Sequence, residues 1–264
     1  MNDFLNKSPK NTAFRRTDLA SELVRSNTVD LDEWISICTV NVSKKASLRL
    51  GKPPGKYTTV LSPVVKLGKT ELYSRLAEVL ADEIKKCVRS TRDCLVVGLG
   101  NPNMTADALG AKVAQKIVIT RSAGSRGVCT LTPFVSALTG VESFESVLGV
   151  VSQIKPSCVI AVDSLCSAHE SRLCTAFQVS NVGIVPGSGV GNHRQPINKT
   201  TIGVPVVSIG VPLVVYATTL VENAGGNPQK TDPDLVVAPK DIDALVEDCA
   251  VVMANAINIV FAGK

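Results

Sequence analysis

The feature that most constrains this fold is a series of short, continuous apolar runs separated by segments of helical pattern. The runs occupy residues 94–100 (CLVVGLG), 158–163 (CVIAVD), 175–180 (TAFQVS) and 205–210 (PVVSIG). Strands that are apolar on both sides belong to sheets that are covered on both faces, and such sheets are largely parallel. We therefore predict an α/β fold, a three-layer domain with a largely parallel central sheet.

The helical segments are read from apolar spacing and from cap residues. Spacing predicts helices over residues 71–87 and about 239–260, and Thr105 is a predicted N-cap of a third helix. Residues 200–221 carry no charge and are long enough to raise the question of a membrane span. Because proline and glycine interrupt them, we predict a strand, a break and then a helix, and no contact with a membrane.

Composition narrows the function classes. The 264 residues, 45% hydrophobic and 19% charged, are typical of a globular domain, and a net charge of +5 is too small for a dedicated nucleic-acid binder. We expect no direct nucleic-acid role. The first sixteen residues, MNDFLNKSPKNTAFRR, lack the apolar core of a secretory signal, so a cytoplasmic location is expected. The eight cysteines form no C-x-x-C pair and are predicted to be buried free thiols.

A basic stretch precedes the first predicted helix. Residues 41–57 contain five lysines and arginines and no acid, together with Pro53, Pro54 and Gly55. This pattern predicts an exposed basic loop or hairpin. Contact with an acidic partner and a merely solvated face are both compatible with it.

Two aspartates are the candidates for chemistry. Asp163 ends an apolar run, and Asp107 follows another strand and its loop, so both are expected at the carboxyl edge of the sheet. One ionised carboxylate can activate water while a neutral one protonates a leaving group. The alternative is that Asp107 satisfies a helix start and Asp163 caps the helix after its strand. The spacing alone leaves both interpretations open.

A glycine-rich loop at residues 186–192 (PGSGVGN) is the second candidate. Its backbone N–H groups can point at an anion or an oxyanion, or it can be a simple connection. Pro196 opposes the helix that a dinucleotide site needs after such a loop. With only His169 and His193 and no H-E-x-x-H motif, neither a metal nor an organic cofactor is expected.

Seven motifs, in order along the chain, together resemble the germination protease family of spore-forming bacteria, which degrades small acid-soluble spore proteins. They are TDLASE, VVGLGN with MTADALG, TPFVSALTGVES, VIAVDSL, GIVPGSGVGN, TIGVPVVSIGVPLVV and LVVAPKDID. The resemblance implies a fold related to hydrogenase maturation proteases, atypical endopeptidase chemistry, a homotetramer, and a place in the cytoplasm of the forespore or spore core.

The resemblance also implies residue roles. The two essential aspartates of the family correspond to Asp107 and Asp163. TDLASE, at residues 17–22, fits the sequence that the family cuts after an acid, which implies self-cleavage between Asp18 and Leu19. Residues 1–18 are then a propeptide and 19–264 a single α/β peptidase domain. The glycine loop is expected to shape the cleft or to supply N–H donors, through the following residues: Gly187, Ser188, Gly189, Gly191 and Asn192.

Two alternatives stay open at this point. Asn181 and Ala106 stand where the family usually has an aspartate and a proline, which motivates a catalytically weakened relative that binds spore proteins. A peptidase acting on a metalloenzyme precursor, as the fold relatives do, is the other alternative.

Overall fold

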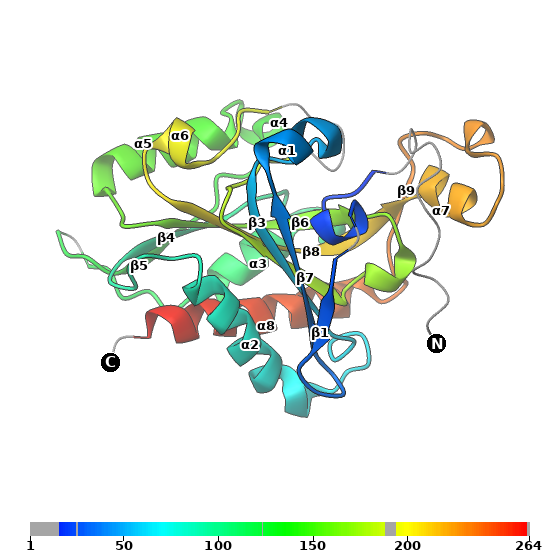
Figure 1. Cartoon of the computed structure of the whole chain (residues 1–264). Helices are drawn as coiled ribbons and strands as arrows, with labels where there is room; N and C mark the ends of the chain where they lie inside the picture. Colours follow the sequence, from blue (N-terminus) through cyan, green and yellow to red (C-terminus); the bar gives the residue numbers. More distant parts are fainter. Residues whose placement is uncertain (1–15, 25, 123, 188–193, 263–264) are drawn as a thin grey trace.

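The structure is a computed structural model, and it describes residues 16–24, 26–122, 124–187 and 194–262. One mixed sheet organises these residues, with strands in the order β1-β2-β3-β7-β8-β6-β4-β5, and β9 pairs with β8 (Figure 1). The strands are β1 (Thr28–Asp30), β2 (Ser36–Val42), β3 (Gly55–Leu61), β4 (Cys94–Gly98), β5 (Val128–Leu131), β6 (Val159–Ser167), β7 (Ala176–Ser180), β8 (Val206–Tyr216) and β9 (Val236–Val237).

The sheet has a parallel half and an antiparallel half. β8, β6, β4 and β5 are parallel neighbours, whereas β1, β2, β3 and β7 continue the sheet from β8 through antiparallel pairs. Among the described strands, β1, β3, β4, β5, β6 and β8 therefore run one way, and β2, β7 and β9 run the other. The predicted largely parallel sheet is confirmed. The antiparallel half was not predicted.

Helices cover both faces of the sheet, which confirms the three layers. One face is packed by α2, α3 and α8, and the other by α5 and α6 (Figure 1). By length and composition α8 could cross a membrane, but 61% of its apolar window is buried within the fold. The helices are α1 (Lys44–Leu50), α2 (Tyr73–Lys85), α3 (Leu109–Gln115), α4 (Ser136–Thr139), α5 (Ser143–Ile154), α6 (Lys199–Ile202), α7 (Ala217–Asn223) and α8 (Ile242–Phe261).

The predicted break inside residues 200–222 is wrong. β8 continues through Gly210 and Pro212 before α7 begins. Pro212 of β8 is opposite Leu165 of β6, and the pairing of the two strands shifts register just after this pair. Such an irregularity leaves an N–H group unpaired, so the N–H that proline lacks is not needed there. Its carbonyl still accepts the N–H of Cys174 at 2.9 Å.

The basic stretch forms part of a hairpin. β2 and β3 pair along their whole length, and α1 lies in the connection between them. The expected hairpin is therefore present, with a helical turn in its loop.

A close backbone contact fixes the region after β4. A Cβ atom on Gly110 of α3 would lie 2.4 Å from the Leu99 nitrogen and 2.7 Å from the Val162 oxygen. Only glycine allows α3 to lie directly on β4 and β6. The turn that precedes α3 is thereby held beside the middle of β6.

Candidate active site

Asp163 lies within β6 rather than at its end. The pairing of β4 with β6 stops at Val162, and β6 continues beside β8 to Ser167, so Asp163 stands where β4 has ended. Its side chain is buried, and its Oδ1 accepts the N–H of Ser164 at 3.0 Å. Burial raises the pKa of Asp163 well above the usual aspartate range, and the negative charges of Asp107 and Asp18 raise it further.

Asp107 belongs to a single 3-10 turn, Thr105–Asp107, that precedes α3. Thr105 is not the predicted N-cap: its hydroxyl instead donates to Asp243 at 2.8 Å. Oδ2 of Asp107 accepts the N–H of Asn101 at 2.8 Å. Gly100, at φ +97°, allows this approach, because a Cβ there would lie 2.1 Å from the Asp107 carbonyl oxygen.

The two aspartates are electrostatically coupled and differ in environment. Burial raises the pKa of Asp107, while the Asn101 N–H and the charge of Arg194 oppose that rise. Asp163 is more strongly shifted, and Arg194 opposes that shift as well. Arg194 also lies 4.0 Å from Glu142. One carboxyl that holds its proton beside another that ionises more readily is the arrangement that general acid and base catalysis needs.

The N-terminal segment Thr17–Glu22 lies on the sheet beside Asp163. In Figure 1 it is the blue stretch that includes a short 3-10 turn, Ala20–Glu22, in front of β6 and β8. The Asp18 N–H donates to the Cys166 carbonyl at 2.9 Å, as in strand pairing. The guanidinium of Arg16 lies 4.5 Å from the ring centre of Tyr216.

Among the described contacts of the Asp18 side chain are a backbone donor and a cation. The Cys166 N–H donates to Oδ2 at 2.9 Å, and the ammonium of Lys52 lies 3.6 Å from Oδ1. Both the Lys52 and Asp18 side chains are mostly buried, with 16% and 11% of their surface exposed. An acid is therefore recognised at this position by a backbone donor and a cation.

The residues after Asp18 are also bound. Leu19 is fully buried against Leu61, Leu165 and Ala176. Ala20 packs on a second cluster that includes Val40 and Tyr57.

The side chain of Gln178 binds the segment from β7. Its Nε2 donates to the Asp18 carbonyl at 3.0 Å, and its Oε1 accepts the Ala20 N–H at 2.9 Å. These two bonds reach the segment's backbone on both sides of Leu19.

Glu22 ends the bound stretch. Its Oε2 accepts the Ala168 N–H at 2.8 Å and the Thr17 hydroxyl. Each of the positions Asp18, Leu19, Ala20 and Glu22 thus has its own contacts, as a bound peptide substrate has.

A protein-family model described as germination protease matches residues 7–225. The chain belongs to the germination protease family. The match includes the segment 17–22 and both aspartates, so the resemblance drawn from the motifs is confirmed.

The sequence is also similar to individual germination proteases. The germination protease of Caldanaerobacter subterraneus is 36% identical, over 86% of this chain and 85% of that protein. The germination protease of Clostridium acetobutylicum is 33% identical, over 92% of this chain and 90% of its own length. A NiFe hydrogenase maturation protease from Thermococcus kodakarensis matches as a structure with a TM-score of 0.42 and 20% identity, over 66% of this chain and 98% of its own.

The structure describes only part of the predicted glycine loop. Gly187 is described, with φ at +71°. Ser188, Gly189, Gly191 and Asn192 lie outside the described residues, so their role as cleft or donor residues stays a prediction. Asn181, at the end of β7, accepts the Lys56 N–H at 3.0 Å.

Potential metal ligands and cysteine thiols can be placed in the described part of the chain. Within the described ranges, no group of three or more histidine, cysteine, aspartate or glutamate side chains is arranged to hold a metal ion. All eight cysteines are free, and most are buried, as predicted.

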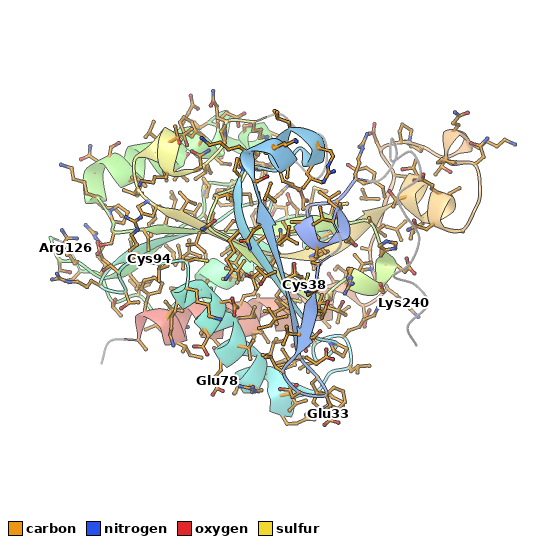
Figure 2. The ribbon with its side chains drawn as sticks, viewed as in Figure 1. Glu33, Cys38, Glu78, Cys94, Arg126 and Lys240 are labelled. Carbon is orange, nitrogen blue, oxygen red and sulfur yellow. The ribbon has the colours of Figure 1, made fainter. Side chains whose placement is uncertain are left out.

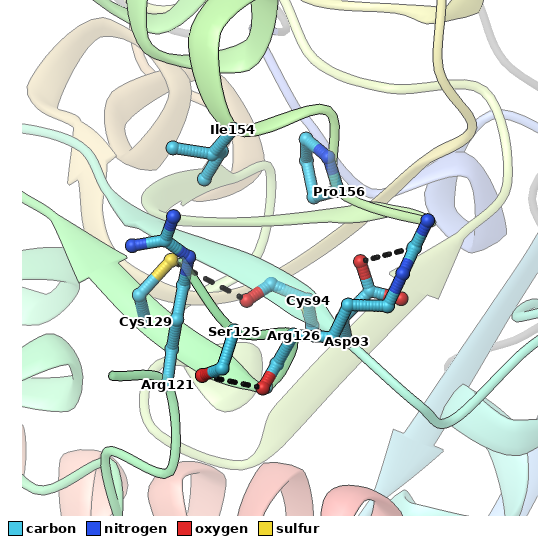
Figure 3. Close-up of a pocket in the computed structure, with 9 residues that line it drawn as sticks. Asp93, Cys94, Arg121, Ser125, Arg126, Cys129, Ile154 and Pro156 are labelled. Carbon is cyan, nitrogen blue, oxygen red and sulfur yellow. Dashed lines mark hydrogen bonds and ion pairs between the residues drawn. The ribbon is translucent and has the colours of Figure 1, made fainter. Parts of the chain in front are cut away.

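A small pocket at the far edge of the sheet does not belong to this site. It is lined by Asp93, Cys94, Arg121 and Arg126 among others. The Arg126 guanidinium lies 3.2 Å from the Asp93 carboxylate, and Figure 3 shows this ion pair. Figure 2 places Arg126 and Cys94 at one end of the molecule and Lys240 at the other. Cys94 begins β4, so the pocket lies at the amino ends of the parallel strands, away from the edge where Asp107 follows β4.

Sequence reasoning missed Lys52, Gln178 and Arg194. Lys52 belonged to the basic stretch, for which an acidic partner was one interpretation, and that partner is Asp18 of the same chain. Arg194 is the second residue after the glycine loop. Gln178 is the one polar residue of the run AFQV, and a lone polar residue inside a buried strand is the signal that would have singled it out.

Proposed function

We propose that this chain is an aspartate-dependent endopeptidase that begins the degradation of small acid-soluble DNA-binding spore proteins during germination. It is made as a zymogen that cuts itself between Asp18 and Leu19, so that residues 1–18 are a propeptide. The single observation that carries the proposal is the binding of TDLASE beside Asp163, with contacts to each of the positions that define the motif. The segment occupies the site as a substrate does.

The difference between the two aspartates supports an assignment of roles. Asp163, whose pKa burial raises well above the usual range, keeps its proton and gives it to the Leu19 nitrogen as the peptide bond breaks. Asp107, whose raised pKa is opposed by Asn101 and Arg194, ionises and accepts a proton from the attacking water. The negative charge of Asp18 favours the protonated form of Asp163, so an acidic substrate helps to set the site for its own cleavage.

The substrate class and the assembly are proposed from the resemblance to the family. A spore protein with an exposed segment of the TDLASE type presents the same acid, apolar residue, alanine and glutamate to the site. The homotetramer and the location in the spore core are proposed from the resemblance, and sedimentation of the purified chain tests the tetramer.

The test of the proposal is self-processing. The full chain, incubated at mildly acidic pH, is expected to yield a new N-terminus at Leu19, detected by mass spectrometry. Asp107→Asn and Asp163→Asn are expected to abolish it. Asp82→Asn changes an exposed aspartate of α2 and serves as the matched control. The proposal fails if both site variants process themselves as the wild type does.

A further inference from the structure

Gln178 reaches the bond between Asp18 and Leu19 from the sheet. Its side-chain Nε2 donates to the Asp18 carbonyl oxygen at 3.0 Å, and its Oε1 accepts the Ala20 N–H at 2.9 Å. The Asp18 carbonyl is the one that hydrolysis between Asp18 and Leu19 would attack. Gln178 therefore directly contacts an atom that would take part in the reaction, the Asp18 carbonyl oxygen.

The orientation of the Gln178 amide follows from its two partners. A carbonyl oxygen accepts and an N–H donates, so Nε2 must face the Asp18 oxygen and Oε1 the Ala20 nitrogen. The reversed amide would oppose two acceptors on one side and two donors on the other. Gln178 is also only 8% exposed, so water competes little for either bond.

Strand register places Gln178 and Asp163 at the same level of the sheet, two strands apart. Gln178 of β7 and Asp163 of β6 are both aligned with Gly210 of β8, which lies between them. Their neighbours Phe177 and Val162 pack on the face covered by α2, α3 and α8, so Gln178 and Asp163 both point to the opposite face. Two strand spacings place their backbones ~10 Å apart. Both side chains therefore project from the face of the sheet on which Leu19 packs, and Gln178 contacts the backbone of the segment from there.

We infer that Gln178 binds the carbonyl oxygen of the bond to be cut and stabilises the negative charge that develops on it, an inference that rests on the proposed function. When water adds to the Asp18 carbonyl carbon, the electron pair of the C=O double bond moves to the oxygen. That oxygen stays within reach of Nε2–H. The C–N bond then breaks, the carbonyl re-forms, and the Leu19 nitrogen leaves with a proton. A donor 2.7–3.1 Å from such an oxygen is typical of an oxyanion hole.

The test compares self-processing rates of the full chain. Gln178→Met removes the donor without burying a charge, and processing is expected to slow by roughly 100–1,000-fold, the usual effect of losing one oxyanion donor. Ser180→Ala, two residues along the same face of β7 and bonded to Ser208, is the matched control and is expected to process at the wild-type rate. Circular dichroism checks that each variant is folded.

Gln178→Glu adds a signature that a purely structural role would not give. The introduced carboxyl can donate only when protonated, so the ratio of its processing rate to that of the wild type is expected to rise as pH falls. A folded Gln178→Met or Gln178→Glu variant that processes as fast as the wild type at every pH overturns the role of Gln178 alone. A wild-type chain that never cuts overturns the proposed function, and this inference with it.

Discussion

The ammonium nitrogen of Lys52 lies 3.6 Å from Oδ1 of Asp18, although the two residues come from different segments of the chain. Lys52 lies in the connection between α1 and β3, whereas the backbone of Asp18 is hydrogen-bonded to Cys166 of β6. This ion pair links the hairpin to the acid that precedes the proposed cleavage site. Because both side chains are mostly buried, the pair is screened less than a surface salt bridge.

Lys52→Met is therefore expected to slow self-processing about tenfold, since a partly buried charge pair contributes on the order of 1.4 kcal/mol. The measurement is a double-mutant cycle with Asp18→Asn, in which the Lys52 effect should largely disappear. Lys45→Met, an exposed lysine of the same basic stretch, is the control. Equal effects of Lys52→Met with and without Asp18 would contradict recognition through this pair.

The burial of Leu19 should determine how firmly the segment is bound. Leu19→Ala, made in the Asp163→Asn background so that no cutting occurs, removes an apolar side chain that is fully buried. Such truncations cost about 2–5 kcal/mol, so hydrogen exchange of the backbone amides of residues 19–22 is expected to rise by at least about 25-fold. Leu48→Ala changes a leucine that is 91% exposed, and it should leave that exchange unaltered. Unchanged exchange in Leu19→Ala would mean that other contacts hold the segment.

Asp163 should cost stability at neutral pH. Its folded pKa is raised by burial and by neighbouring negative charge, so the folded state binds more protons than the unfolded state above the ordinary aspartate pKa. Stability is therefore lost as pH rises from that value through the raised pKa. Asp163→Asn is expected to melt at a higher temperature than the wild type at pH 7. The difference should shrink as pH falls toward 4, and thermal melts across this range decide the matter; a gap that grows on acidification contradicts the shift.

Arg194 should set the pH range of activity. Its positive charge lowers the pKa of both Asp107 and Asp163, so Arg194→Met is expected to raise both. Both limbs of the pH–rate profile for self-processing should then move to higher pH. Arg126→Met, which removes the partner of Asp93 at the far edge of the sheet, is the control. A profile that stays in place in Arg194→Met would show that the arginine acts elsewhere.

Local pattern predicted the parts of the site that depend on nearby residues. The apolar runs gave β4, β6, β7 and the start of β8, and the loop after β4 gave the approximate place of Asp107. The apolar pattern did not predict where β6 and β8 end, because their ends depend on pairing between residues far apart in the sequence. β6 continues past Asp163, and β8 continues past Pro212, because each supports the other across the register shift.

The sequence by itself determined the family, the α/β class and the presence of the TDLASE motif, because these depend on residue order and on periodicity that adjacent residues carry. Only the tertiary structure decided what binds that motif. Gln178 and Cys166 lie about 150 residues from Asp18 along the chain. They meet it because β3, β7, β8 and β6 lie side by side in that order. Strand order arises from the packing of the whole sheet between its helices, and no local stretch of sequence encodes it.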